Sequence, residues 1–237
     1  MTSPYDDQHE VEQLRKWLNE NWLPLGAGLA LGLIAILSWQ AWNRAQDAHA
    51  AEGSRIYADL GRAADVGRLG DATGMADTLV KDFSGTPYAA SGAMRAAEAD
   101  VAGGKFEDAG ARLQWVVEYE SHGSPLLGLQ SALHLHLIDH PRDPALASLA
   151  RLRLAQVLFQ QNKPDEALKQ LDGDAGGYTA LYDQLRGDIK LFQGNRAAAR
   201  AAYQQALQAL SPDEAAAHDG LQRKLDDLAD AAAPEHS

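Results

Sequence analysis

The stretch Gly104-Lys-Phe-Glu-Asp-Ala109 recurs in altered form as Asn162-Lys-Pro-Asp-Glu-Ala167. Each copy begins with a residue suited to a tight turn, and its acidic residues suit the first turn of a helix. Gly70 and Gly194 are expected to be equivalent turn residues, because similar helical patterns flank them. Four such copies in one chain predict stacked helical hairpins.

The positions around these four turns share a pattern of residue size. Seven positions before the turn are Ala63, Ala97, Ala155 and Gly187; five after it are Met75, Ala109, Ala167 and Ala199; nine after it are Leu79, Leu113, Leu171 and Tyr203. The small residues allow two antiparallel helices to pack closely, and the large one is expected to fill the gap to the next hairpin. This is the tetratricopeptide pattern, and the spacings of 34 residues between the first two turns and 32 between the last two agree with it.

The fold class predicted is all-α: one transmembrane helix, then a tetratricopeptide-like right-handed α-solenoid of about four hairpins with a C-terminal capping helix. No run alternates apolar and polar residues as a strand would. In Thr86-Pro87, Asp143-Pro144 and Ser211-Pro212, a side chain expected to cap a helix precedes a proline at the first helical position, so each pair is expected to start a helix. The interval of 58 residues between Gly104 and Asn162 predicts an insertion at 121–142. The last helix is expected from about Pro212 to Leu228, docking through Leu221, Leu225 and Leu228. An Ala-rich bundle without stacking is the alternative.

The stretch from Asn21 to Asn43 contains no charged residue and is long enough to span a bilayer. Trp22 lies at one margin, and Trp39 and Trp42 lie at the other, as aromatic residues do at membrane surfaces. A cleaved signal peptide is the competing interpretation, because Ala48-His49-Ala50 resembles a cleavage site. That site lies well beyond the apolar run, and the segment that precedes the apolar run is long and acidic. A retained anchor is therefore favoured.

The predicted division is an amphipathic segment at 1–22, an anchor at 23–43 and a soluble domain at 44–237. Arg15 and Lys16 precede the anchor and only Arg44 follows it closely, which favours a cytoplasmic amino terminus. Inside the anchor, Gly28 and Gly32 form a GxxxG pattern that allows close packing with another helix.

Composition argues against several classes of function. Lys and Arg total 21 against 33 Asp and Glu, and the net charge of −12 disfavours binding to nucleic acid. The absence of Cys excludes thiolate catalysis and Cys-ligated zinc. No small-molecule substrate or cofactor is indicated.

No motif indicates catalysis or a metal site. His134, His136, Asp139 and His140 are the best metal candidates, but the surrounding leucines fit a packed insertion helix better. The stretch Gly173-Asp-Ala-Gly-Gly177 lacks the Lys-Ser/Thr ending of a phosphate loop and is expected to be a turn. The chain is therefore interpreted as a non-enzyme.

The layout resembles the YfgM-like family of ancillary SecYEG translocon subunits of Gram-negative bacteria. The resemblance covers nearly the whole chain and is carried by Val11-Glu-Gln-Leu-Arg-Lys-Trp-Leu18, the anchor, Gly85-Thr-Pro-Tyr-Ala89, Gln161-Asn-Lys-Pro-Asp-Glu-Ala-Leu168 and Leu185-Arg-Gly-Asp-Ile-Lys-Leu191. The insertion departs from that pattern. The resemblance implies an inner-membrane protein with a periplasmic repeat domain, associated with SecYEG and with a PpiD-type periplasmic chaperone.

Stacked helix pairs present a concave face lined by the first helix of each repeat. On the tetratricopeptide pattern, the candidate partner-binding residues are Ser91, Met94, Glu98, Val101, Leu149, Leu152, Gln156, Phe159, Leu181, Gln184, Asp188 and Leu191. Glu98 and Asp188 are expected to select basic partners, while for each Leu, Val or Phe a place in the ordinary core between repeats is the favoured interpretation. Two hypotheses follow: a scaffold that brings a chaperone to the translocon, and a spacer subunit of an envelope complex that assembles through its anchor.

Overall fold

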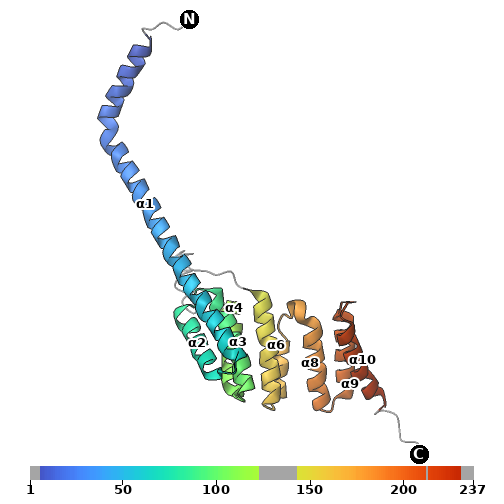
Figure 1. Cartoon of the computed structure of the whole chain (residues 1–237). Helices are drawn as coiled ribbons and strands as arrows, with labels where there is room; N and C mark the ends of the chain where they lie inside the picture. The colour runs from blue at the N-terminus through green and yellow to red at the C-terminus, as the bar shows by residue number, and fades with distance from the viewer. Residues whose placement is uncertain (1–5, 123–142, 212, 231–237) are drawn as a thin grey trace, which may run out of the picture. The chain divides into compact units, whose positions relative to one another are not determined.

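The computed structural model describes residues 6–122, 143–211 and 213–230, and all the regular elements in these ranges are helical. The chain divides into two compact units, Met1–Glu52 and Gly53–Ser237. In chain order (Figure 1), the elements are α1 (Asp6–Asp65), α2 (Leu69–Asp82), α3 (Pro87–Ala102), α4 (Phe106–His122), α6 (Pro144–Gln160), α7 (Pro164–Leu171), the short 3-10 helix η1 (Gly176–Tyr178), α8 (Thr179–Phe192), α9 (Arg196–Ala209) and α10 (Ala215–Asp230).

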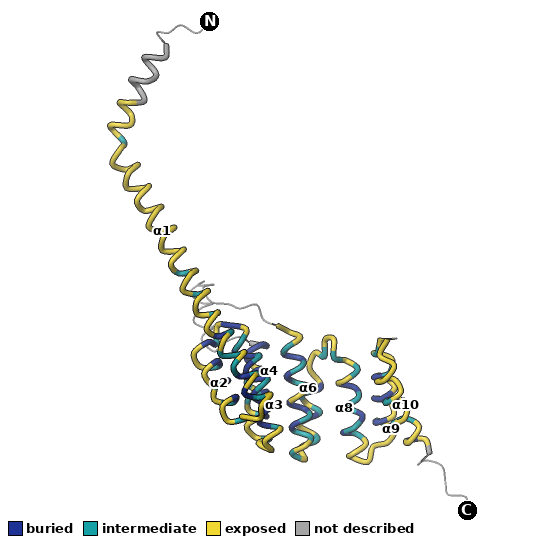
Figure 2. Tube along the Cα trace, in the orientation of Figure 1, coloured by how far each residue is buried: buried dark blue, intermediate teal, exposed yellow. Residues whose placement is uncertain are grey.

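The first unit is the amino-terminal part of α1, which is long and apolar enough to cross a membrane. The large apolar side chains between Leu23 and Leu37 are exposed; Leu29 is 70% and Leu31 68% exposed. Figure 2 shows this part of α1 as almost wholly exposed, whereas an apolar core helix of a soluble domain would be buried. No described atom lies within 4 Å of where a Cβ would stand on Gly28 or Gly32, and the partner helix expected there stays a prediction.

The second unit is a stack of four hairpins and a capping helix, as the repeat pattern predicts. The end of α1 pairs with α2, α3 with α4, α6 with α7 and α8 with α9. Its apolar side chains are buried in clusters between neighbouring helices, and Figure 2 shows buried residues, in dark blue, along the helices of the stack. Burial of these side chains between amphipathic helices supplies the main stabilisation of such a fold.

Each hairpin turns at one residue with a left-handed backbone. These residues are Gly67 (φ 76°), Gly104 (φ 73°), Asn162 (φ 60°) and Gly194 (φ 78°). In each case the N–H of the following residue returns to the carbonyl oxygen five residues earlier, a Schellman motif: Arg68 to Ala63 at 2.8 Å, Lys105 to Asp100 at 2.7 Å, and Lys163 to Leu158 and Asn195 to Lys190 at 2.9 Å. The chain thus enters the next helix almost at once.

The expected turn at Gly70 is wrong, although the other three are confirmed. Gly70 lies inside α2, and Gly67 makes the first turn. Counted from Gly67, the residue five positions later is Ala72, which is fully buried like Ala109, Ala167 and Ala199. The cap expected of the Thr86 side chain is also wrong, because its hydroxyl donates to the Phe83 carbonyl oxygen at 2.7 Å instead.

Close approach of two helices is clearest in the last hairpin. A Cβ added to Gly187 of α8 would lie 2.3 Å from the Tyr203 ring of α9. Tyr203 is fully buried and also packs with Leu221 and Leu228 of α10. The smallest residue of the repeat pattern therefore accommodates its largest one, and the same ring reaches the capping helix.

The insertion does not interrupt the stack. α4 and α6 share one core that contains Val116, Leu154 and Val157. Where the chain returns, the Asp143 N–H donates to the buried Glu120 carboxylate at 2.9 Å, and Arg151 donates to the Ser121 hydroxyl at 2.8 Å. The Asp143 side chain caps α6, as expected. Residues 123–142, and with them His134, His136, Asp139 and His140, lie outside the described residues.

The capping helix begins later than expected, at Ala215 and not at Pro212. The Glu214 carboxylate accepts a hydrogen bond from the Ser211 N–H at 2.7 Å, so these residues form the turn before α10. Leu221 and Leu228 are buried against α9 and Leu225 is partly buried, which confirms the predicted docking stripe.

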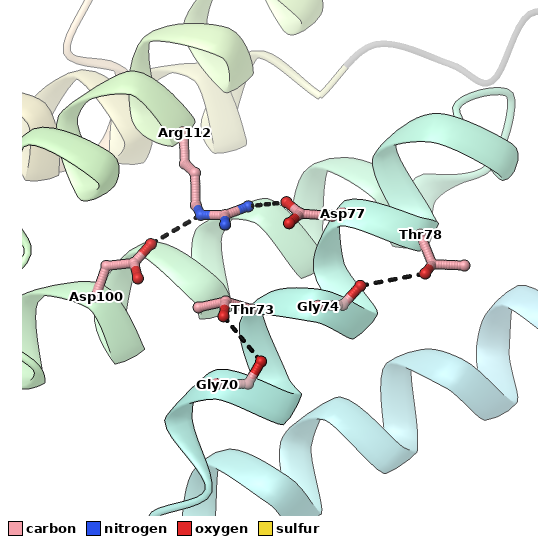
Figure 3. A network of polar contacts seen from close by, with 7 residues as sticks. All are labelled: Gly70, Thr73, Gly74, Asp77, Thr78, Asp100 and Arg112. Carbon is pink, nitrogen blue, oxygen red and sulfur yellow. Dashed lines mark hydrogen bonds and ion pairs between the residues drawn. The ribbon is translucent and has the colours of Figure 1, made fainter.

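A group of ion pairs centred on Arg112 joins the first two hairpins (Figure 3). Arg112 of α4 donates to Asp100 of α3 at 2.8 Å and to Asp77 of α2 at 2.5 Å, and Asp100 is only 3% exposed. Burial lowers the pKa of Arg112, but the hydrogen bonds to the two carboxylates outweigh this effect and raise it. One guanidinium therefore holds three helices together.

Replacing Gly187 by Ala should lower the free energy of unfolding by about 1–3 kcal/mol, because the new methyl group would overlap the Tyr203 ring. The control is Gly70→Ala, which lies in a helix with open space around it and should leave stability unchanged or raise it by up to about 1 kcal/mol. Urea denaturation of the full-length protein in mild detergent, followed by circular dichroism, measures both. A Gly187→Ala protein as stable as the wild type would contradict the close approach.

Replacing Arg112 by Leu should cost about 3–5 kcal/mol, because it leaves the buried Asp100 carboxylate without its cation. Arg62→Leu removes an exposed ion pair with Asp59 and should cost no more than about 1 kcal/mol. The same denaturation experiment compares them. Equal losses would mean that the Arg112 pair contributes no more than a surface one.

Candidate functional site

A groove of about 400 Å³ lies between the first helices of the second and third hairpins. Its walls and floor are Met94, Ala97, Glu98, Val101, Leu113, Arg153, Gln156, Val157 and Gln160. Helical spacing places the α3 members on one face of α3 and the α6 members on one face of α6. Leu113 of α4 closes the floor. We call this surface the α3–α6 groove.

Four of the predicted binding residues line the α3–α6 groove: Met94, Glu98, Val101 and Gln156. The others on these helices lie elsewhere. Ser91 and Leu149 are half-buried, and Leu149 packs against the core shared by α3, α4 and α6. Leu152 is 2% exposed and belongs to a different core, which lies between α6, α7 and α8, and Phe159 is half-buried against that core.

The predicted residues on α8 are divided between solvent and the capping helix. Leu181 is exposed, Gln184 is half-buried, and Leu191 borders a second, smaller cavity with Asp188. The Asp188 carboxylate accepts a hydrogen bond from the Tyr203 hydroxyl at 2.7 Å and pairs with Lys224 of α10 at 2.5 Å. Burial, and then the bond to Asp188, raise the pKa of Tyr203. Asp188 therefore helps to hold α10 in place.

An aromatic pair lies where α6 and α8 end. The rings of Phe159 and Phe192 meet edge to face with centroids 5.3 Å apart, and Phe192 is 60% exposed. The sequence reasoning missed Phe192 and named its neighbour Leu191 as the candidate binding residue.

The charges of the α3–α6 groove differ between its two walls. On α3, Glu98 pairs with Arg95 at 3.2 Å, and Arg95 also pairs with Asp65. On α6, Arg153 donates to the Gln156 side-chain oxygen at 3.2 Å. The sequence reasoning missed Arg153 and Gln160. The only signal for them was helical spacing from Gln156, because an isolated Arg or Gln on a helix is usually a solvated surface residue.

The residues of the α3–α6 groove offer contacts suited to binding another chain. They are apolar, amide, guanidinium and carboxylate side chains, with no Ser, Thr, Cys or His among them. Within the described residues, no group of three or more His, Cys, Asp or Glu could hold a metal ion. The stretch from Gly173 to Gly177 leads into η1 and forms the turn between α7 and α8, as expected.

Comparisons with known proteins place the chain among helical-repeat proteins. The family model described as a tetratricopeptide repeat-like domain matches residues 15–125 and 130–230. Similar curated proteins are ancillary SecYEG translocon subunits. That of Escherichia coli K12 is 28% identical over 200 residues, 84% of this chain and 86% of the relative. Those of Haemophilus influenzae and Neisseria gonorrhoeae are 24% and 22% identical over 88% and 96% of this chain, and 92% and 100% of the relatives. No solved structure matches significantly.

Proposed function

The chain belongs to the tetratricopeptide repeat-like domain family, and from this membership we propose that it is a membrane-tethered protein–protein interaction scaffold at the Sec translocon. The observation that carries the proposal is the extent of the match to the E. coli ancillary SecYEG subunit. It covers 84% of this chain and 86% of that protein, so it takes in far more than one repeat. A scaffold of this kind works through its surfaces and needs no reactive group.

We further propose the topology expected from the sequence. Residues 1–22 would be cytoplasmic, residues 23–43 would span the bacterial inner membrane, and residues 44–237 would lie in the periplasm. The excess of Arg15 and Lys16 over Arg44 beside the anchor supports this orientation.

The stack of hairpins is proposed to link the translocon to a PpiD-type periplasmic chaperone for newly translocated proteins. Support comes from the α3–α6 groove, where an apolar floor and polar rims lie together on an extended helical surface. The competing hypothesis is a spacer subunit that assembles through its anchor alone. The open faces of Gly28 and Gly32 favour it as the second candidate.

The topology predicts which side of the membrane each end occupies. The chain has no Cys, so single substitutions give unambiguous labels. In intact spheroplasts, a membrane-impermeant maleimide should label Gln204→Cys, an exposed position on α9, and should label Ser3→Cys only after lysis. Labelling of Ser3→Cys in intact spheroplasts would reverse the orientation.

Exchanging residues 23–43 for an unrelated transmembrane helix separates the two functional hypotheses. A scaffold should still co-purify with the PpiD-type chaperone, because its hairpins are unchanged. A spacer that assembles through its anchor should lose its partners. The matched control restores the native anchor in the same fusion and must behave as the wild type. Loss of the chaperone on exchange alone would overturn the scaffold proposal.

A further inference from the structure

We infer that the α3–α6 groove takes a partner segment in which an apolar side chain lies beside an acidic one. The inference rests on the proposed function, because it names the chemistry of a segment that the scaffold binds. It reverses the charge expected from the sequence, where Glu98 and Asp188 were predicted to select basic partners.

Both of these carboxylates already have cationic partners within the chain. Glu98 pairs with Arg95 at 3.2 Å, and Asp188 pairs with Lys224 at 2.5 Å while accepting the Tyr203 hydroxyl. A basic segment would have to compete with these pairs, so the acids give it little net attraction.

Arg153 is the cation of the α3–α6 groove that lacks such a partner. It is exposed, and it donates to the neutral Gln156 amide on its own helix. No carboxylate of the described residues lies within ion-pair distance of it. A guanidinium has five N–H donors in a planar fork, so most of them stay available to a carboxylate.

The rest of the groove fits the remainder of such a segment. Met94, Leu113 and Val157 give it a buried apolar floor. Gln156 and Gln160 are one helical turn apart on the same wall as Arg153, so their amides are placed to hydrogen-bond a peptide backbone. Since the whole chain carries a net charge of −12, acidic segments are repelled elsewhere and attracted only where a cation is locally uncompensated. Arg153 therefore sets where and in which orientation the segment docks.

Two dye-labelled peptides test the inference by fluorescence anisotropy with the full-length protein in detergent. One contains Leu-Glu-Leu-Glu-Leu between Ser-Gly flanks, and the other has Lys in place of Glu. The acidic peptide should bind more tightly to the wild type. Arg153→Glu should weaken its binding by about tenfold or more, the value of a charge-assisted hydrogen bond. Arg153→Lys should retain much of the preference, because it keeps the charge.

The matched control is Arg200→Glu, an exposed residue of α9 outside both cavities, which makes the same change in net charge. It should bind the acidic peptide as the wild type does. Circular dichroism melting verifies that both variants are folded. The inference is overturned if neither peptide binds, if the basic peptide binds equally well, or if the two Arg→Glu variants lose affinity equally. Chaperone co-purification in the anchor exchange reports separately on the proposed function.

Discussion

The repeat domain depends on one constraint: each pair of helices must reverse direction within three residues and then pack almost in contact. A left-handed residue meets the first part, and Gly67, Gly104, Asn162 and Gly194 supply it with the same pair of backbone hydrogen bonds. Small residues meet the second part. Because all four turns use the same backbone conformation and hydrogen bonds, the hairpins repeat as a regular stack with a surface that runs along it.

The side-chain contacts between hairpins differ in kind from those between the two helices of one hairpin. Within a hairpin the fit is one of size, as with Gly187 and Tyr203. Between the first two hairpins, the ion pair of Arg112 with Asp77 adds a directional contact, and the buried Asp100 holds the same guanidinium from within the second hairpin. At the carboxyl end, Asp188 and Lys224 provide a similar contact to the capping helix. Such pairs resist sliding of one apolar helix over another, which size complementarity alone permits.

The anchor, the hairpins and the capping stripe could be predicted because helical periodicity and turn residues are local features. The first turn was misplaced for a physical reason. Counted from the true turn at Gly67, the large residue is Leu60 and the small one is Ala76, the reverse of Ala97 and Leu113 in the next hairpin. The usual order, a small residue before the turn and a large one after it, appears only if Gly70 is taken as the turn residue, because Ala63 and Leu79 then occupy these positions. At the groove, spacing identified Met94, Glu98 and Gln156, whereas the pairing of Glu98 with Arg95 and the open charge of Arg153 depend on side-chain contacts that spacing does not specify.

The hydrogen bond between the Asp143 N–H and the Glu120 carboxylate brings the end of α4 and the start of α6 together. This hydrogen bond joins the two points at which the chain leaves and re-enters the stack, and the neighbouring bond from Arg151 to Ser121 reinforces it. These two contacts, with the shared apolar core, fix the register of α4 against α6. A reporter or an epitope grafted between His122 and Asp143 is therefore expected to leave the register of the helices on either side unaltered.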